Sequence, residues 1–148
     1  MWPMTPDPPD GPAAARALVL DTNIVLDLLL FQDPASTPLQ AALCGGALHW
    51  LSTEPMREEL ARVLDYPPLR KSLSWHQLDS AQVLARYDAL AHRAAAAPKA
   101  CVTCKDADDQ KFIDLAVQHR ALLLSKDRAV LCMKKRLSAL GVQALTAL

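Results

Sequence analysis

Short apolar runs alternate along the chain with longer segments whose apolar positions recur at helical spacing. The short runs predict buried strands, and the longer segments predict helices. The predicted strands cover 17–20, 47–52, 100–103, 121–125 and 142–146, the last of them at an edge of the sheet. The predicted helices cover 24–31, 38–44, 54–65, 74 to about 97, 107–119 and 128–140. Strands that alternate with helices favour an α/β domain built on a parallel sheet.

Local signals set the ends of these elements. Thr22 or Asn23 can cap the first helix, because their side chains accept hydrogen bonds from free backbone amides. Pro67-Pro68 predicts a loop between two helices. Residues 1–16 are rich in proline and predict a flexible tail, which leaves 17–148 as the folded domain.

The bulk composition limits the class of protein. A chain of 148 residues is large enough for one domain with a single core, and 51% hydrophobic residues indicate a packed globule. Lys+Arg and Asp+Glu both number 16, so the net charge of zero gives no overall attraction to nucleic acid. The apolar runs are too short to span a membrane, and the start of the chain lacks the features of a signal peptide. We therefore expect a cytoplasmic protein with reduced cysteines.

Carboxylates gather at four places along the chain. They are Asp21, the pair Glu58 and Glu59, the group Asp106, Asp108 and Asp109, and Asp127. The first and last of these follow predicted strands, and functional residues of parallel sheets collect at the carboxyl ends of strands. Clustered carboxylates repel one another and lose hydration, and a hard divalent cation is the usual reason to retain them.

In their order and spacing, four segments resemble the motifs of the PIN domain family. They are LVLDTNIVLDLL, LSTEPMREELARVLDYP, DDQKFIDLA and LLLSKDRAVL. The resemblance covers about residues 17–146 and is greatest to the branch of toxins from toxin–antitoxin pairs. It implies a three-layer α/β/α fold around a mainly parallel sheet of four to five strands. Residues 17–148 would then form a PIN-like nuclease domain.

The resemblance also implies an activity and its partners. The expected activity is that of a metal-dependent endoribonuclease, which hydrolyses RNA phosphodiesters by in-line attack of a metal-activated water. One or two Mg²⁺ or Mn²⁺ ions would be bound. A small antitoxin and a homodimer are the implied protein partners. The family pattern places Asp21, Glu59, Asp109 and Asp127 as catalytic metal ligands, with Asn23 and Ser125 as polar support.

Other roles are open for several of these acids. Asp21 could cap the following helix instead of binding an ion. Adjacent helix positions point in different directions, so only one of Glu58 and Glu59 can face the site, and the family register favours Glu59. Asp106 and Asp109 share a face of the next helix. The register favours Asp109 as the ligand, and Asp106 as a supporting residue or a helix cap.

Basic and sulfur-containing residues admit two interpretations each. Lys126, Arg128 and Lys134 lie near the fourth motif and are predicted to bind substrate phosphates, although a solvated helix face has the same pattern. Cys101 and Cys104 form a CxxC pair with no second pair at zinc spacing, so we interpret them as small buried thiols.

Two other functions compete with the nuclease. The chain could keep the fold and act only as a catalytically silent module that binds RNA or a protein partner. A phosphatase of the haloacid dehalogenase type is disfavoured, because it needs a second aspartate where Asn23 stands. Metal titration separates the nuclease from the silent module, since a silent module gains no carboxylate-dependent stability from manganese.

Overall fold

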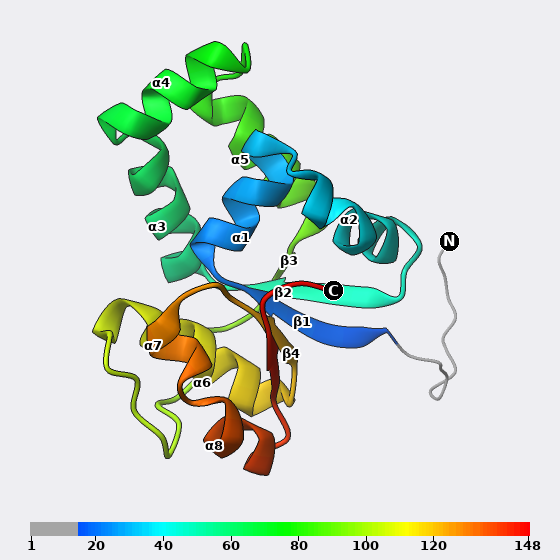
Figure 1. Cartoon of the computed structure of the whole chain (residues 1–148), viewed down its shortest axis with the longest axis vertical. Helices are drawn as coiled ribbons and strands as arrows, with labels where there is room; N and C mark the ends of the chain where they lie inside the picture. Colours follow the sequence, from blue (N-terminus) through cyan, green and yellow to red (C-terminus); the bar gives the residue numbers. More distant parts are fainter. Residues whose placement is uncertain (1–14) are drawn as a thin grey trace.

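The computed structural model describes residues 15–148, which form one central sheet with helices on both of its faces (Figure 1). The predicted tail, residues 1–16, lies almost entirely outside the described residues. Its last residue, Arg16, already belongs to the first strand.

The sheet has five strands, all parallel, in the order β3-β2-β1-β4-β5. The strands are β1 (Arg16–Leu20), β2 (Leu48–Ser52), β3 (His92–Arg93), β4 (Leu122–Leu124) and β5 (Gln143–Leu145). The predicted fold class, a three-layer α/β/α arrangement around a parallel sheet, is confirmed. The last strand lies at an edge, as the sequence predicts.

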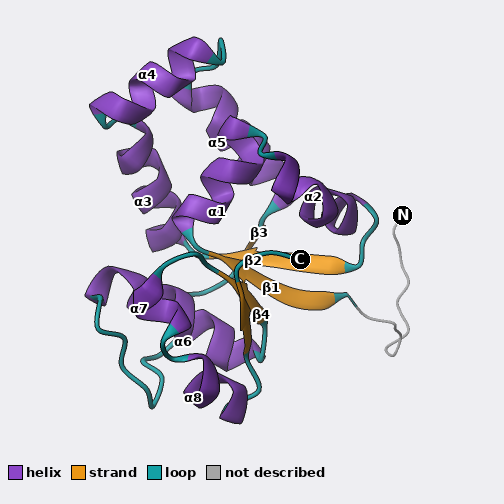
Figure 2. Ribbon diagram, viewed as in Figure 1, coloured by secondary structure: helices purple, strands orange, loops and turns teal. Residues whose placement is uncertain are grey.

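The two faces of the sheet carry different helices (Figure 2). One face is covered by α1 (Thr22–Leu26), the π-helical turn η2 (Asp27–Phe31), η3 (Pro34–Ser36), α2 (Thr37–Cys44), α3 (Glu54–Leu64), α4 (Pro67–Trp75) and α5 (Ser80–Leu90). The other face is covered by α6 (Gln110–His119), preceded by the turn η4 (Ala107–Asp109), and by α7 (Arg128–Leu131) and α8 (Lys134–Ala139). None of the helices in the described residues is both long and apolar enough to cross a membrane.

Side-chain alternation along the central strands builds a separate core on each face. In β1, Leu18 and Leu20 pack against the helices of the first half, whereas Val19 packs against those of the second half. In β4, Leu122 and Leu124 take the first side and Leu123 the second. Strands buried on both faces carry continuous apolar runs, which explains why LVL and LLL contain no polar residue.

Three predicted elements between α3 and α6 were wrong. Pro67-Pro68 does not form a loop but begins α4, because a proline in the first turn costs the helix no hydrogen bond. The long helix predicted from 74 to about 97 is absent, since α4 ends at Trp75 and α5 spans only Ser80–Leu90. The third strand is His92–Arg93, which pairs with Leu51 and Ser52, and not 100–103.

Two other helices differ in detail from their predictions. The helix predicted at 24–31 begins at Thr22 and continues as a π-helical turn from Asp27. The helix predicted at 128–140 is broken near Cys132 and Met133 into α7 and α8. The short breaks change the direction of the chain without changing the order of the elements.

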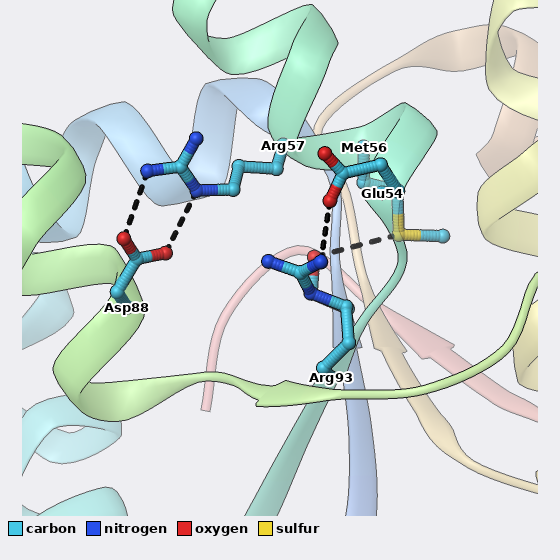
Figure 3. A network of polar contacts seen from close by, with 6 residues as sticks. Glu54, Met56, Arg57, Asp88 and Arg93 are labelled. Atoms are coloured by element: carbon cyan, nitrogen blue, oxygen red, sulfur yellow. Dashed lines mark hydrogen bonds and ion pairs between the residues drawn. The ribbon is translucent and has the colours of Figure 1, made fainter.

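Charged side chains fix the short edge strand β3 to its neighbouring helices (Figure 3). Arg57 on α3 donates to both carboxylate oxygens of Asp88 on α5, each at 2.8 Å. Arg93 on β3 donates to Glu54 at the start of α3. A bidentate arginine–carboxylate pair is geometrically specific, so these contacts set how α3, α5 and β3 meet.

Candidate metal centre

Asp21 lies at the carboxyl end of β1, next to the carboxyl end of β4. Its backbone N–H donates to the carbonyl of Leu124 at 3.1 Å, which continues the pairing of the two strands. Its Oδ1 accepts from the N–H of Ile24 at 3.0 Å, so Asp21 is the cap of α1. The prediction that Thr22 or Asn23 caps this helix was therefore wrong, and both lie inside it. The cap holds the carboxylate in a fixed, buried position.

Ser125 connects the ends of the two strands. Its hydroxyl, fully buried, donates to Asp21 Oδ2. The hydroxyl oxygen of Ser125 also accepts from the backbone N–H of Asp127 at 3.0 Å. Asp127 in turn caps α7, because its Oδ1 accepts from the N–H of Ala129 at 2.8 Å. One hydroxyl therefore orients the Asp21 carboxylate and holds the backbone of Asp127.

Asp109, at the end of the turn before α6, brings a further carboxylate to Asp127. Asp106 caps the turn η4 by accepting from the N–H of Asp108 at 2.9 Å, and Asp109 ends the same turn. Carboxylate oxygens of Asp106, Asp109 and Asp127 all lie within 4.8 Å of one another. Asp109 is only 9% exposed, and its buried Oδ2 has no hydrogen-bond partner.

The crowding of these acids changes their protonation. Burial, the proximity of Asp127 and the charges of Asp106 and Asp21 raise the pKa of Asp109 to about 8. Burial also raises the pKa of Asp21, against the hydrogen bonds from Ser125 and Ile24. Two ionised carboxylates cannot approach so closely without a proton or a cation between them. The unpartnered Oδ2 of Asp109 and the neighbouring carboxylates of Asp106 and Asp127 fit a hard divalent cation.

Comparisons with known proteins bear on the family and the fold. A family model described as the PIN domain matches residues 17–129, which is more than half of the chain. The chain belongs to the PIN domain family. Among solved structures, this PIN domain is similar to one described as VapBC2 from Rickettsia felis bound to a DNA fragment from their promoter, with a TM-score of 0.57 and 13% identity. The match covers 86% of this chain and 98% of that one. No curated protein matches the chain.

Glu59 takes a different place from the three aspartates. It lies on α3 with its side chain 14% exposed, whereas the neighbouring Glu58 is exposed. Its Oε2 accepts from the Thr22 hydroxyl, and its Oε1 accepts from the ammonium of Lys111 on α6. Sequence reasoning missed Thr22 and Lys111. The only signal for Lys111 was a lone cation in the first turn of the helix that follows the acidic group.

The remaining predicted site residues lie around this centre. Asn23 is exposed on α1. Lys126 pairs with Asp27, which leaves it half-exposed at the start of the loop after β4. Arg128 is exposed and lines a hollow with Lys105 beside α7. Lys134 lines a different hollow near β5, so the structure does not join it to Arg128.

Of the two cysteines predicted to be buried thiols, only Cys104 is buried. Cys104 is buried, and its Sγ donates to the carbonyl of Ala129 at 3.3 Å. Cys101 is exposed, so its interpretation as a buried thiol was wrong. The apolar residues around position 101 that suggested a strand belong instead to a loop that packs over α6.

Proposed function

We propose that this PIN domain is a metal-dependent endoribonuclease and the toxin of a toxin–antitoxin pair, acting in the cytoplasm. One observation carries the proposal: three carboxylates from two separate segments converge, and one of them keeps a buried oxygen without a donor. A structure retains such a group when something binds it, because an unsatisfied buried carboxylate is costly.

The residues of the centre divide into ligands and supports. Asp109, Asp127 and Asp106 would hold Mg²⁺ or Mn²⁺, and Asp21 adds negative charge beside them. Through its hydroxyl, Ser125 orients the Asp21 carboxylate and holds the backbone of Asp127. When bound, a divalent ion activates a water for attack and offsets charge on the phosphate. Arg128, exposed after Asp127, supplies a cation for a neighbouring phosphate of the RNA.

The protein partners follow from the family and its neighbour. The similar structure from Rickettsia felis is a VapBC2 complex bound to promoter DNA. We propose that this chain also pairs with a small antitoxin and forms a homodimer. Light scattering of the purified chain tests the dimer, and a strict monomer at high concentration would contradict it.

The test of the activity is RNA cleavage with Mn²⁺ or Mg²⁺ by the wild type, Asp109→Asn and Asp108→Asn. Asparagine matches the shape of aspartate but removes its charge. Asp108 is exposed and adjacent in sequence, so its variant is the matched control. We expect cleavage that requires metal, is unchanged by Asp108→Asn and falls at least about 100-fold in Asp109→Asn, as expected when a group that stabilises transition-state charge is lost.

Two outcomes would contradict the proposal. Cleavage that persists in a chelator, or that survives in Asp109→Asn, would exclude this centre as the active site. A wild type that binds no manganese and cuts none of a mixed set of RNAs would favour the catalytically silent binding module.

A further inference from the structure

The ammonium of Lys111 lies between Glu59 and the turn that carries Asp109. It donates to Glu59 Oε1 and to the backbone carbonyl of Asp108, the residue before Asp109. The two side chains of the ion pair are largely buried, 25% exposed for Lys111 and 14% for Glu59. A buried ion pair with additional hydrogen bonds is held in place, unlike a surface pair.

On this side of the centre, each carboxylate oxygen of Asp21 and Glu59 already accepts a hydrogen bond. Asp21 accepts from Ile24 with one oxygen and from Ser125 with the other. Glu59 accepts from Thr22 with one oxygen and from Lys111 with the other. In contrast, Asp109 keeps an oxygen with no donor on the other side. Asp109 Oδ2 is thus a buried oxygen of the centre that accepts no hydrogen bond, whereas both oxygens of Glu59 already accept one.

We propose that the Lys111 ammonium takes the place of a second divalent cation beside Glu59, so that the centre binds a single ion through Asp106, Asp109 and Asp127. This inference rests on the proposed metal centre and specifies its stoichiometry. A fixed positive charge at Glu59 repels a second cation and competes with it for the same carboxylate oxygen. Lys111 is thus a positioning residue, which holds Glu59 and contributes charge without binding the ion.

The test is the stoichiometry of Mn²⁺ binding to the full chain, measured by calorimetry and by the electron paramagnetic resonance signal of free Mn²⁺. We expect one ion for the wild type and two for Lys111→Met, which keeps the length of the side chain and removes its charge. The double variant Lys111→Met/Glu59→Gln should return to one ion, because it loses the second ligand as well. Lys71→Met, on exposed α4, is the matched control and should bind one.

Two ions bound by the wild type, or one ion bound by folded Lys111→Met, would overturn the inference. If Lys111→Met does not fold, the wild-type stoichiometry still decides, and Lys111→Arg should remain at one ion. A wild type that binds one ion but cuts no RNA would leave the inference standing and refute the nuclease. A wild type that binds no ion would overturn both.

Discussion

Asp109 is a carboxylate whose buried oxygen faces another carboxylate instead of a donor. With a pKa raised from the ordinary 3.8 to about 8, it keeps its proton in the folded chain where the unfolded chain has lost it. The folded state therefore binds more protons between these values, and its free energy of unfolding falls as the pH rises through this range. Thermal melts of the metal-free protein at a series of pH values measure this fall.

Asp109→Asn separates this effect from other titrations. The amide cannot ionise, so the variant should lose much of the pH dependence and exceed the wild type in stability near pH 8. The expected gain is about 1–3 kcal/mol, because the amide is never charged and can donate a hydrogen bond to the neighbouring Asp127. Asp21, whose pKa is also raised, leaves a smaller slope in the same direction. Parallel pH profiles for the variant and the wild type would contradict the assignment.

Ser125 orients the carboxylate of Asp21 and holds the backbone of Asp127. Ser125→Ala leaves Asp21 Oδ2 and the N–H of Asp127 without their partner. We expect a loss of about 1–3 kcal/mol in unfolding free energy, because both groups are desolvated. Manganese affinity should fall roughly tenfold or more, as for other residues that orient ligands. Ser72→Ala on exposed α4, which removes only a bond to Pro68, should change neither quantity. An unchanged manganese affinity in Ser125→Ala would reject the orienting role.

At the scale of the element, the start of α5 is set by Asp79, the residue that caps it. The Asp79 side chain accepts from the N–H of Gln82 at 2.8 Å, and the Gln82 side chain accepts from the N–H of Asp79 at 2.9 Å. This reciprocal capping box positions Tyr87, whose ring meets Trp50 edge-on at 5.1 Å between centroids. Asp79→Ala should therefore cost about 1 kcal/mol in urea unfolding, without altering manganese binding. Asp65→Ala, at the exposed end of α3, should cost much less; equal losses would show that the cap contributes nothing.

The sequence could predict the central strands but not the break in the helix predicted from 74 to about 97. The strands at 17–20 and 121–125 were predictable, because runs of leucine and valine buried on both faces have few alternatives. The helix from 74 to 97 failed because its alanines favour a helix, whereas Asp79 starts a new helix and Gln77, at φ 57°, has already turned the chain. His92 and Arg93 leave the helix to pair with β2, a contact that local propensity cannot reveal.

The candidate site was predictable only in part for a related reason. Acidic residues after apolar runs indicate strand ends, and strand order then places Asp21 beside Asp127. The pairing of Glu59 with Lys111 depends on how α3 and α6 approach from opposite layers of the sheet. Residues 59 and 111 share no local pattern, so only the assembled fold shows that Glu59 forms an ion pair with Lys111.

At the scale of the whole molecule, a net charge of zero means that the proposed nuclease would have to bind RNA through a local patch. Lys126 is paired with Asp27, whereas Arg128 is exposed after the acidic centre. Each phosphate contact to a single strand contributes about −0.7 to the slope of log affinity against log salt. The slope is measured with the Asp109→Asn protein, which should leave the RNA uncut, and it should correspond to only a few contacts. Arg128→Ala added to it should reduce the slope by about one contact. Arg70→Ala, on α4, should leave it unchanged, and equal effects of the two arginines would place the RNA elsewhere.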